Sequence, residues 1–126
     1  MAKKKVLLVD DEADFLTLMT KVLDSWGYDV VTASNGNEAI ELFKSEKPRA
    51  IILDYVMPDI SGVELLKKIR EIDKRVPAIM FTARPTVKAI EESKQLNIIA
   101  FIPKLSPYVN THEDLRMALD LVCRGV

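Results

Sequence analysis

Short apolar runs alternate along the chain with longer stretches in which apolar residues recur at every third or fourth position. Runs rich in branched residues predict strands, and the recurring stripes predict amphipathic helices that bury one side. The predicted strands are Val6–Val9, Tyr28–Ala33, Ile51–Leu53, Ala78–Phe81 and Ile98–Ile102. A helix is expected after each of them.

The first predicted helix carries its apolar residues at helical spacing and stops at a glycine. Its stripe is Phe15, Met19, Val22 and Trp26, followed by Gly27. The stretch from Thr86 to Leu96 has Val87 and Ile90 as its main apolar residues, with many charges around them. We therefore expect it to form the weakest helix of the chain.

Capping residues mark the starts of three other helices. A Ser or Asn can accept a hydrogen bond from an amide in the first turn, and a Glu three residues later can reach back to the cap. The pairs are Asn35 with Glu38, Ser61 with Glu64, and Asn110 with Glu113. Each pair indicates where a helix begins.

The repeated alternation of strand and helix, with short connections, predicts an α/β protein: a doubly wound sandwich with a parallel sheet between helices. The first and third runs are the most apolar and should be central neighbours, whereas Tyr28–Ala33 carries Asp29 and should lie nearer an edge. In such folds ligands bind in the crevice at the carboxyl ends of the central strands. Chemistry is therefore expected there.

Composition narrows the class of protein without changing this picture. The 126 residues, 48% of them apolar, suit one domain spanning residues 1–126. The 18 basic and 19 acidic residues form no broad basic field, so direct binding of nucleic acid is not expected. A single Cys and a single His exclude an internal disulfide and a Cys/His zinc site.

No apolar run is long enough to span a membrane or to act as a signal peptide. The expected location is therefore the cytoplasm.

Polar residues follow the predicted strands at the end where a parallel sheet binds ligands. They are Asp10, Asp11, Asp54, Thr82 and Lys104. Each has an ordinary explanation as a cap, a strand former or a surface charge, but four strand ends that carry such residues favour a shared site. Carboxylates in one crevice raise one another's pKa unless a cation joins them, and carboxylate oxygens with water suit Mg²⁺. With an ammonium and a hydroxyl nearby, the set predicts a seat for a phosphoryl group on Asp54.

Four motifs together resemble the receiver domain of two-component response regulators, over essentially the whole chain. They are Leu7–Glu12, Leu53–Pro58 with Gly62, Thr82–Ala83, and Phe101–Lys104. The resemblance implies a flavodoxin-like (βα)5 fold with strand order 2-1-3-4-5. It also implies that Asp54 accepts a phosphoryl group from a phosphohistidine on a sensor histidine kinase or a histidine phosphotransfer protein. The chain would then be a signalling switch that promotes its own phosphorylation and dephosphorylation, not an enzyme acting on a separate substrate.

The resemblance also implies roles for individual residues. Asp11, Asp54 and the backbone carbonyl of Val56 would ligate Mg²⁺, with Asp10 acting mostly through water. Lys104 would pair with the phosphoryl group, Thr82 would move towards it, and Phe101 would turn inward. A downstream protein target would read that change on the face of the fourth helix, fifth strand and last helix.

The chain departs from the family pattern in one place and has informative residues at two variable positions. Leu105 follows Lys104 where the family usually has a cis proline, and a trans bond is expected here because a cis bond before a residue other than proline costs about 3 kcal/mol. Val56 cannot orient an attacking water, and Arg84 could shield the phosphoryl group. The aspartyl phosphate should therefore be long-lived.

Three other readings remain open at this point. A haloacid-dehalogenase-like phosphatase would need a second Asp two residues after the nucleophile, where this chain has Val56. Flavodoxin would need a Ser/Thr-rich phosphate loop where this chain has Asp10, Asp11 and Glu12. The third is a docking module that is never phosphorylated. We expect a stand-alone regulator acting through protein contacts, with an excised piece of a longer regulator as the alternative.

Overall fold

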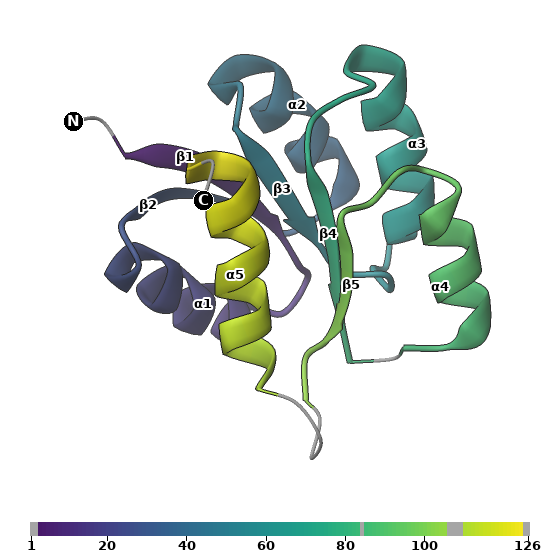
Figure 1. Ribbon diagram of the computed structural model, residues 1–126. Coiled ribbons are helices and arrows are strands. Elements are labelled where there is room, and N and C mark those ends of the chain that lie inside the picture. Colours follow the sequence, from purple (N-terminus) through teal and green to yellow (C-terminus); the bar gives the residue numbers. More distant parts are fainter. Residues whose placement is uncertain (1–2, 84, 106–109, 125–126) are drawn as a thin grey trace.

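Strands and helices alternate along the chain as predicted. The computed structural model describes residues 3–83, 85–105 and 110–124, and Figure 1 shows the arrangement of its elements. The strands are β1 (Lys4–Val9), β2 (Tyr28–Ala33), β3 (Ala50–Leu53), β4 (Ala78–Thr82) and β5 (Ala100–Pro103). The helices are α1 (Ala13–Ser25), α2 (Gly36–Glu46), α3 (Gly62–Ile72), α4 (Val87–Lys94) and α5 (Thr111–Arg124).

The strands form one parallel sheet in the order β2-β1-β3-β4-β5. The predicted fold class and strand order are confirmed: β1 and β3 are neighbours and β2 lies at an edge. In register, Val9 lies beside Leu53, and Leu53 lies beside Met80. The residues that follow β1 and β3 therefore emerge side by side at the carboxyl ends of the central strands.

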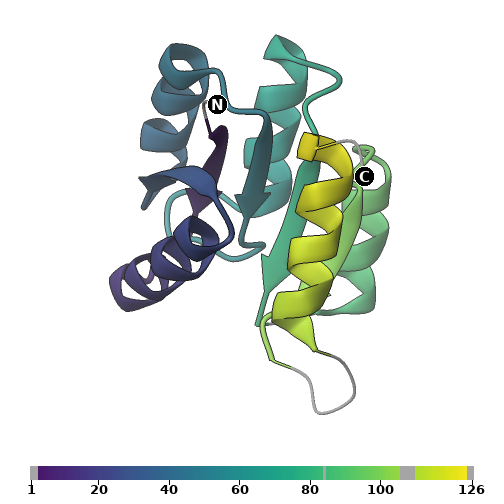
Figure 2. The ribbon, with the colours of Figure 1, turned by 60° about the vertical axis from the view of Figure 1, so that its left-hand side comes forward.

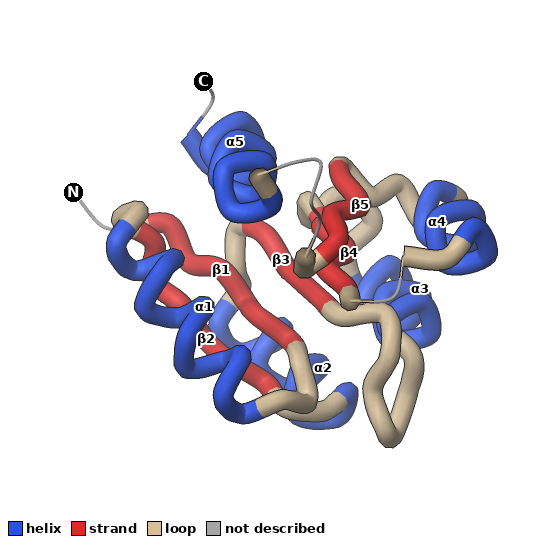
Figure 3. The backbone as a smooth tube through the Cα atoms, turned by 90° about the horizontal axis from the view of Figure 1, so that it is seen from below, coloured by secondary structure: helices blue, strands red, loops and turns tan. Residues whose placement is uncertain are grey.

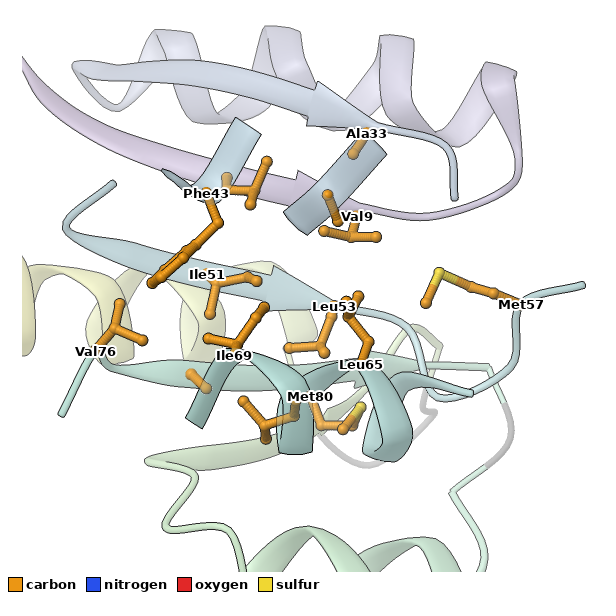
Figure 4. Packing of buried hydrophobic residues seen from close by; sticks show 14 of the residues in the cluster. Val9, Ala33, Phe43, Ile51, Leu53, Met57, Leu65, Ile69, Val76 and Met80 are labelled. Carbon is orange, nitrogen blue, oxygen red and sulfur yellow. The ribbon is translucent and has the colours of Figure 1, made fainter. Parts of the chain in front are cut away.

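Helices cover both faces of the sheet, which leaves its central strands fully buried. Figure 3 shows α1 and α5 on one side and α2, α3 and α4 on the other, and Figure 2 shows α5 lying along the sheet near β5. Alternate residues of β1 face opposite cores: Leu7 and Val9 pack with α2 and α3, and Val6 and Leu8 pack with α1 and α5. Figure 4 shows the first of these cores from close by.

The predicted helix caps form through backbone amides. Asn35 Oδ1 accepts from the Glu38 amide at 2.9 Å, Ser61 Oγ accepts from the Glu64 amide at 3.1 Å, and Asn110 Oδ1 accepts from the Glu113 amide at 3.0 Å. These contacts satisfy amides that have no partner inside the helix. Local sequence therefore sets the starts of α2, α3 and α5.

The fourth helix and fifth strand differ in detail from the prediction. α4 ends at Lys94, and its fully buried residues are Ala89 and Ser93, whereas Val87 is 71% exposed. β5 begins at Ala100, later than expected. The small residues Ala89 and Ser93 let α4 approach the rest of the domain, a contact that a count of large apolar residues does not reveal.

No helix in the described part of the chain is long and apolar enough to cross a membrane.

Candidate functional site

Backbone hydrogen bonds hold the residues at the strand ends. The amide of Asp10 donates to Ala33 O at 3.1 Å, and that of Asp54 donates to Val9 O at 3.1 Å. The amide of Lys104 donates to Thr82 O at 2.8 Å. Because each bond continues the ladder of the sheet beyond a strand, the positions of these Cα atoms are set by the fold.

Three carboxylates converge at this edge of the sheet. One oxygen from each of Asp10, Asp11 and Asp54 lies within 4.8 Å of the other two. Asp10 is 1% exposed and Asp54 is 7% exposed, whereas Asp11 is open to solvent. The strand ends thus bring together all three of the carboxylates expected to share a site.

The ammonium of Lys104 lies among these carboxylates. Its Nζ is 2.6 Å from Asp10 Oδ2, 3.4 Å from Asp54 Oδ2 and 3.5 Å from Glu12 Oε1. The lysine side chain is 7% exposed, so its contacts with the buried Asp10 and Asp54 are shielded from water, whereas the Glu12 side chain is 66% exposed. Asp10 therefore contacts the ammonium directly. Its other oxygen, Oδ1, accepts a hydrogen bond from the Glu12 amide at 3.0 Å, which helps to hold the carboxylate in place.

Burial and the neighbouring groups have opposite effects on the pKa values of Asp10 and Lys104. Burial raises the pKa of the Asp10 carboxyl above its ordinary value, although the hydrogen bonds from Lys104 and the Glu12 amide lower it. Burial by itself would lower the pKa of Lys104, but its hydrogen bond to Asp10 and the charges of Asp54, Asp10 and Glu12 outweigh burial and raise it. The ammonium is therefore charged at neutral pH.

Asp54 uses its two carboxylate oxygens differently. Oδ2 faces Lys104, while Oδ1 is buried and has no hydrogen-bond partner among the described residues. A buried carboxylate oxygen without a partner costs free energy, about 1–3 kcal/mol for a polar group and more for a charged one. Asp54 together with Asp11 and Asp10 also fits a divalent cation, because hard cations take carboxylate oxygens as ligands.

A cleft of about 230 Å³ opens over this cluster. Its lining residues are Asp11, Glu12, Asp54, Val56, Thr82 and Ala83. Val56 is 48% exposed, whereas Thr82 is 1% exposed at the end of β4. The cleft is open to solvent, so a small anion can reach Asp54 from outside.

The start of α3 presses against the backbone of Asp54. The Gly62 amide donates to Tyr55 O at 2.7 Å, and a Cβ on Gly62 would lie 2.1 Å from the Asp54 carbonyl oxygen. No side chain fits in that gap. Gly62 therefore lets the loop after β3 close tightly and helps to hold Asp54 in place.

The arrangement matches one protein family. A family model for the response regulator receiver domain matches residues 6–119. The chain belongs to this family. Receiver domains are the signalling switches of two-component systems, so the resemblance read from the four motifs is confirmed.

Two curated relatives come from Bacillus subtilis (strain 168). Sporulation initiation phosphotransferase F is 33% identical over 104 residues, which are 82% of this chain and 84% of that protein. Alkaline phosphatase synthesis transcriptional regulatory protein PhoP is 43% identical over 81 residues, which are 64% of this chain but only 34% of that protein. The chain thus spans about a third of the length of PhoP and similar transcriptional regulators.

A solved structure gives the same fold. The chemotaxis protein CheY4 of Vibrio cholerae superposes with a TM-score of 0.83 at 30% identity, over 96% of this chain and 99% of that one. Its likeness extends over nearly the whole domain. The flavodoxin-like topology of this receiver domain is therefore established by both its own strand order and its neighbours.

The other predicted positions of the receiver domain lie as follows. Phe101 is half-buried in β5 and packs against the core on the side of α2 and α3. The Lys104–Leu105 bond is trans, as expected, and Lys104 still reaches Asp54. Arg84 lies outside the described residues, so its predicted shielding role stays a prediction.

Sequence reasoning missed three contacts of the site. Glu12 pairs with Lys104, the Phe15 ring lies 4.1 Å from the Lys104 ammonium, and Tyr55 donates to Glu92 on α4 at 3.0 Å. Glu12 was readable from its position beside the acidic pair. The contacts of Phe15 and Tyr55 join segments far apart in sequence, and no local pattern signals them.

Proposed function

We propose that Asp54 is the phosphoacceptor of this receiver domain. In this proposal a phosphohistidine on a sensor histidine kinase or a histidine phosphotransfer protein donates the phosphoryl group, and residues 1–126 form one domain that changes its protein contacts in response. The match to the receiver family over residues 6–119 supports the proposal. So does the relative named as a phosphotransferase, of which the chain covers 84%.

A single observation carries the assignment to Asp54. Asp54 lines an open cleft, and its Oδ1 has no hydrogen-bond partner among the described residues, while Lys104 holds Oδ2. A carboxylate oxygen that no donor occupies keeps its lone pairs available for attack on phosphorus. Asp10 is less suited, because its two oxygens accept from Lys104 and from the Glu12 amide.

The proposed step exchanges one bond to phosphorus for another. A carboxylate oxygen of Asp54 forms a P–O bond as the P–N bond to the donor imidazole breaks, and the electron pair of that bond returns to the imidazole nitrogen. Negative charge spreads over the phosphoryl oxygens in the transition state. The Lys104 ammonium already lies beside Asp54, and the Thr82 side chain lines the same cleft, so both can contact those oxygens.

The donor set suits Mg²⁺. Asp11, Asp54 and the Val56 carbonyl would hold it, with Asp10 acting mostly through water. When bound, the ion would neutralise charge that develops on the phosphoryl oxygens. Asp10, Asp11, Glu12 and Asp54 together supply four carboxylates for the single ammonium of Lys104, and this excess of acid favours a cation.

Phosphorylation would be read elsewhere on the domain. We propose that Thr82 moves towards the phosphoryl group, that Phe101 turns further inward, and that a downstream protein binds the face formed by α4, β5 and α5. Both helices of that face carry exposed apolar residues, which support it as a binding surface: Val87 on α4, and Met117 and Leu121 on α5. The near-neutral charge argues against direct nucleic-acid binding, and we propose that the domain works through protein contacts in the cytoplasm.

Small phosphodonors test the chemistry without knowledge of the kinase. The purified chain is incubated with Mg²⁺ and either acetyl phosphate or phosphoramidate, whose P–N bond resembles that of phosphohistidine. Intact mass should rise by one phosphoryl group, and peptide mapping should place it on Asp54. Asp54→Asn should take up none, whereas Asp29→Asn, an exposed carboxylate on β2, should behave as the parent does.

Two outcomes would count against the proposal. Equal labelling of Asp54→Asn would move the acceptor to another residue. No labelling of the parent with either donor, together with no Mg²⁺ binding by calorimetry, would favour the docking module that is never phosphorylated.

A further inference from the structure

The tip of Lys104 lies against an aromatic ring as well as against carboxylates. The Nζ atom is 4.1 Å from the centroid of the Phe15 ring, in the first turn of α1. Asp10, Asp54 and Glu12 lie within 2.6 to 3.5 Å of the same atom. The lysine side chain is only 7% exposed, and the Phe15 ring covers a side of the ammonium that would otherwise face water.

An aromatic ring and a carboxylate attract an ammonium in different ways. The ring face carries partial negative charge and attracts a cation within about 6 Å, most strongly where water is excluded. It accepts no strong hydrogen bond, so it leaves the N–H groups directed at oxygen atoms. Phe15 can therefore hold the charge in the cleft without competing for the donors that Asp54 or a phosphoryl group needs.

The ring is itself fixed by the core. Phe15 packs on Phe81 with ring centroids 5.8 Å apart and planes tilted by 33°. Phe81 is 2% exposed in β4 and directly precedes Thr82. The surface on which the ammonium rests is therefore tied to the strand that carries another residue of the site.

The residue that follows Lys104 gives the lysine little support. Leu105 is joined by a trans bond and is 88% exposed, so its side chain anchors nothing. Lys104 is held by its backbone, whose amide donates to Thr82 O at 2.8 Å and whose carbonyl accepts from Thr111 Oγ1 at 3.3 Å, and by the contacts of its side-chain tip. Of those contacts, Phe15 is the one that does not depend on the charge state of a carboxylate.

We propose that Phe15 is a positioning residue, which holds the Lys104 ammonium over the cleft by a cation–π contact and so presents it to an anion bound at Asp54. The effect on an anion bound at Asp54 rests on the proposed function. The contact between Phe15 and Lys104 does not, and each claim has its own experiment.

The first test varies ring electronics at constant shape. Residue 15 is replaced by 4-fluoro-, 3,5-difluoro- and pentafluorophenylalanine, which progressively weaken the ring face, and by cyclohexylalanine, which removes it. Unfolding in urea is measured for each, with Lys104 present and in Lys104→Met. Stability should fall stepwise with fluorination only where Lys104 is present. Parallel slopes in the two backgrounds would overturn the contact.

The second test reads the consequence for anion binding. Beryllofluoride, an analogue of the phosphoryl group, is titrated in the presence of Mg²⁺. Its affinity should weaken stepwise along the fluorinated series, by about tenfold for pentafluorophenylalanine, the change expected from losing a desolvated cation–π contact. The same series at Phe43, which is buried in the core on the other face of the sheet, should leave the affinity unchanged.

The outcomes separate the two proposals. If affinity stays the same along the fluorinated series, Phe15 is core filling and the inference fails, while the proposed function stands. If beryllofluoride does not bind the parent, the proposed function fails, and the urea series still decides whether Phe15 holds Lys104.

Discussion

The Tyr55 hydroxyl donates a hydrogen bond of 3.0 Å to a carboxylate oxygen of Glu92 on α4. Tyr55 directly follows Asp54, the candidate phosphoacceptor. The bond therefore links the neighbour of Asp54 to α4, the helix with the weakest apolar face. Burial raises the pKa of the Tyr55 phenol, and the bond to Glu92 raises it further, so the donor keeps its proton at neutral pH. The loop after β3 is thereby tied to α4.

Removing this bond should loosen α4 more than the rest of the domain. Tyr55→Phe loses a partly buried hydrogen bond to a charged acceptor, which contributes about 1 kcal/mol, so amides of α4 should exchange with solvent roughly fivefold faster. Hydrogen exchange measured by mass spectrometry or NMR checks this. Glu92→Gln keeps an acceptor and should show a smaller change, and unchanged protection of α4 in Tyr55→Phe would mean that the bond does not hold the helix.

A methyl group at Gly62 should disrupt the site. The Cβ would lie 2.1 Å from the Asp54 carbonyl oxygen, so the backbone must shift, at a cost of about 3 kcal/mol. Gly62→Ala should therefore unfold at lower urea and lose phosphorylation by acetyl phosphate. Gly36→Ala is the comparison, because its Cβ would meet a side-chain methyl of Ile60 at 2.3 Å and not a backbone atom, so it should lower stability less. Equal stability of the two variants would contradict the backbone clash.

Thr82→Ala should separate phosphorylation from its readout. The Lys104 ammonium and the acidic cluster remain in place, so Asp54 should still be labelled, although the loss of the Thr82 hydroxyl can slow the reaction. The shift of Thr82 towards the phosphoryl group would be lost, and most of the response of Phe101 with it. Amide chemical shifts of β5 and α4, recorded with and without beryllofluoride, measure that response. A response equal to the parent's would rule out Thr82 as the link.

Val56 should prolong the life of the aspartyl phosphate. Its side chain lines the cleft and is 48% exposed, but it has no polar atom to orient an attacking water. Val56→Asn supplies one, and the rate of phosphate loss should rise on the order of tenfold. Val87→Asn, an exposed valine on α4, serves as control. Arg84→Glu tests the companion prediction from the sequence, that Arg84 shields the phosphoryl group. Unchanged rates in both would dispose of the idea.

The phenol of Tyr28 should stay neutral at pH values that ionise ordinary tyrosines. Burial raises its pKa, and the hydrogen bond that it donates to Asp120 raises it further against the opposing effect of Arg124. Because folding raises this pKa, the stability from the pair is complete below about pH 10 and is lost as pH rises above it. Ultraviolet titration and urea unfolding of the parent and Tyr28→Phe check this. An ordinary tyrosine is about half ionised at pH 10, so a tyrosinate absorbance at that pH that is lower in Tyr28→Phe by about half of one residue would contradict it.

The sequence by itself determined the order of the elements, the class of fold and the residues at the strand ends. These are readable because they depend on local features: branched runs make buried strands, Asn35, Ser61 and Asn110 cap helices, and parallel strands must end at a common edge. Asp10, Asp54 and Lys104 could be assigned to one site for that reason. Even the trans bond before Leu105 followed from the identity of one residue.

Only the tertiary structure decided which side chains touch. Lys104 takes Asp10 as its nearest partner, although nothing in the sequence ranks Asp10 above Asp54. The sequence suggests that Phe15 is an ordinary core residue, yet its ring lies against the Lys104 ammonium. Tyr55 donates a hydrogen bond to Glu92 on α4, the helix whose buried residues the sequence did not predict correctly. Such contacts follow from the distances between elements and from competition among several charged partners. Both depend on how the helices pack on the sheet, and no local pattern of residues encodes them.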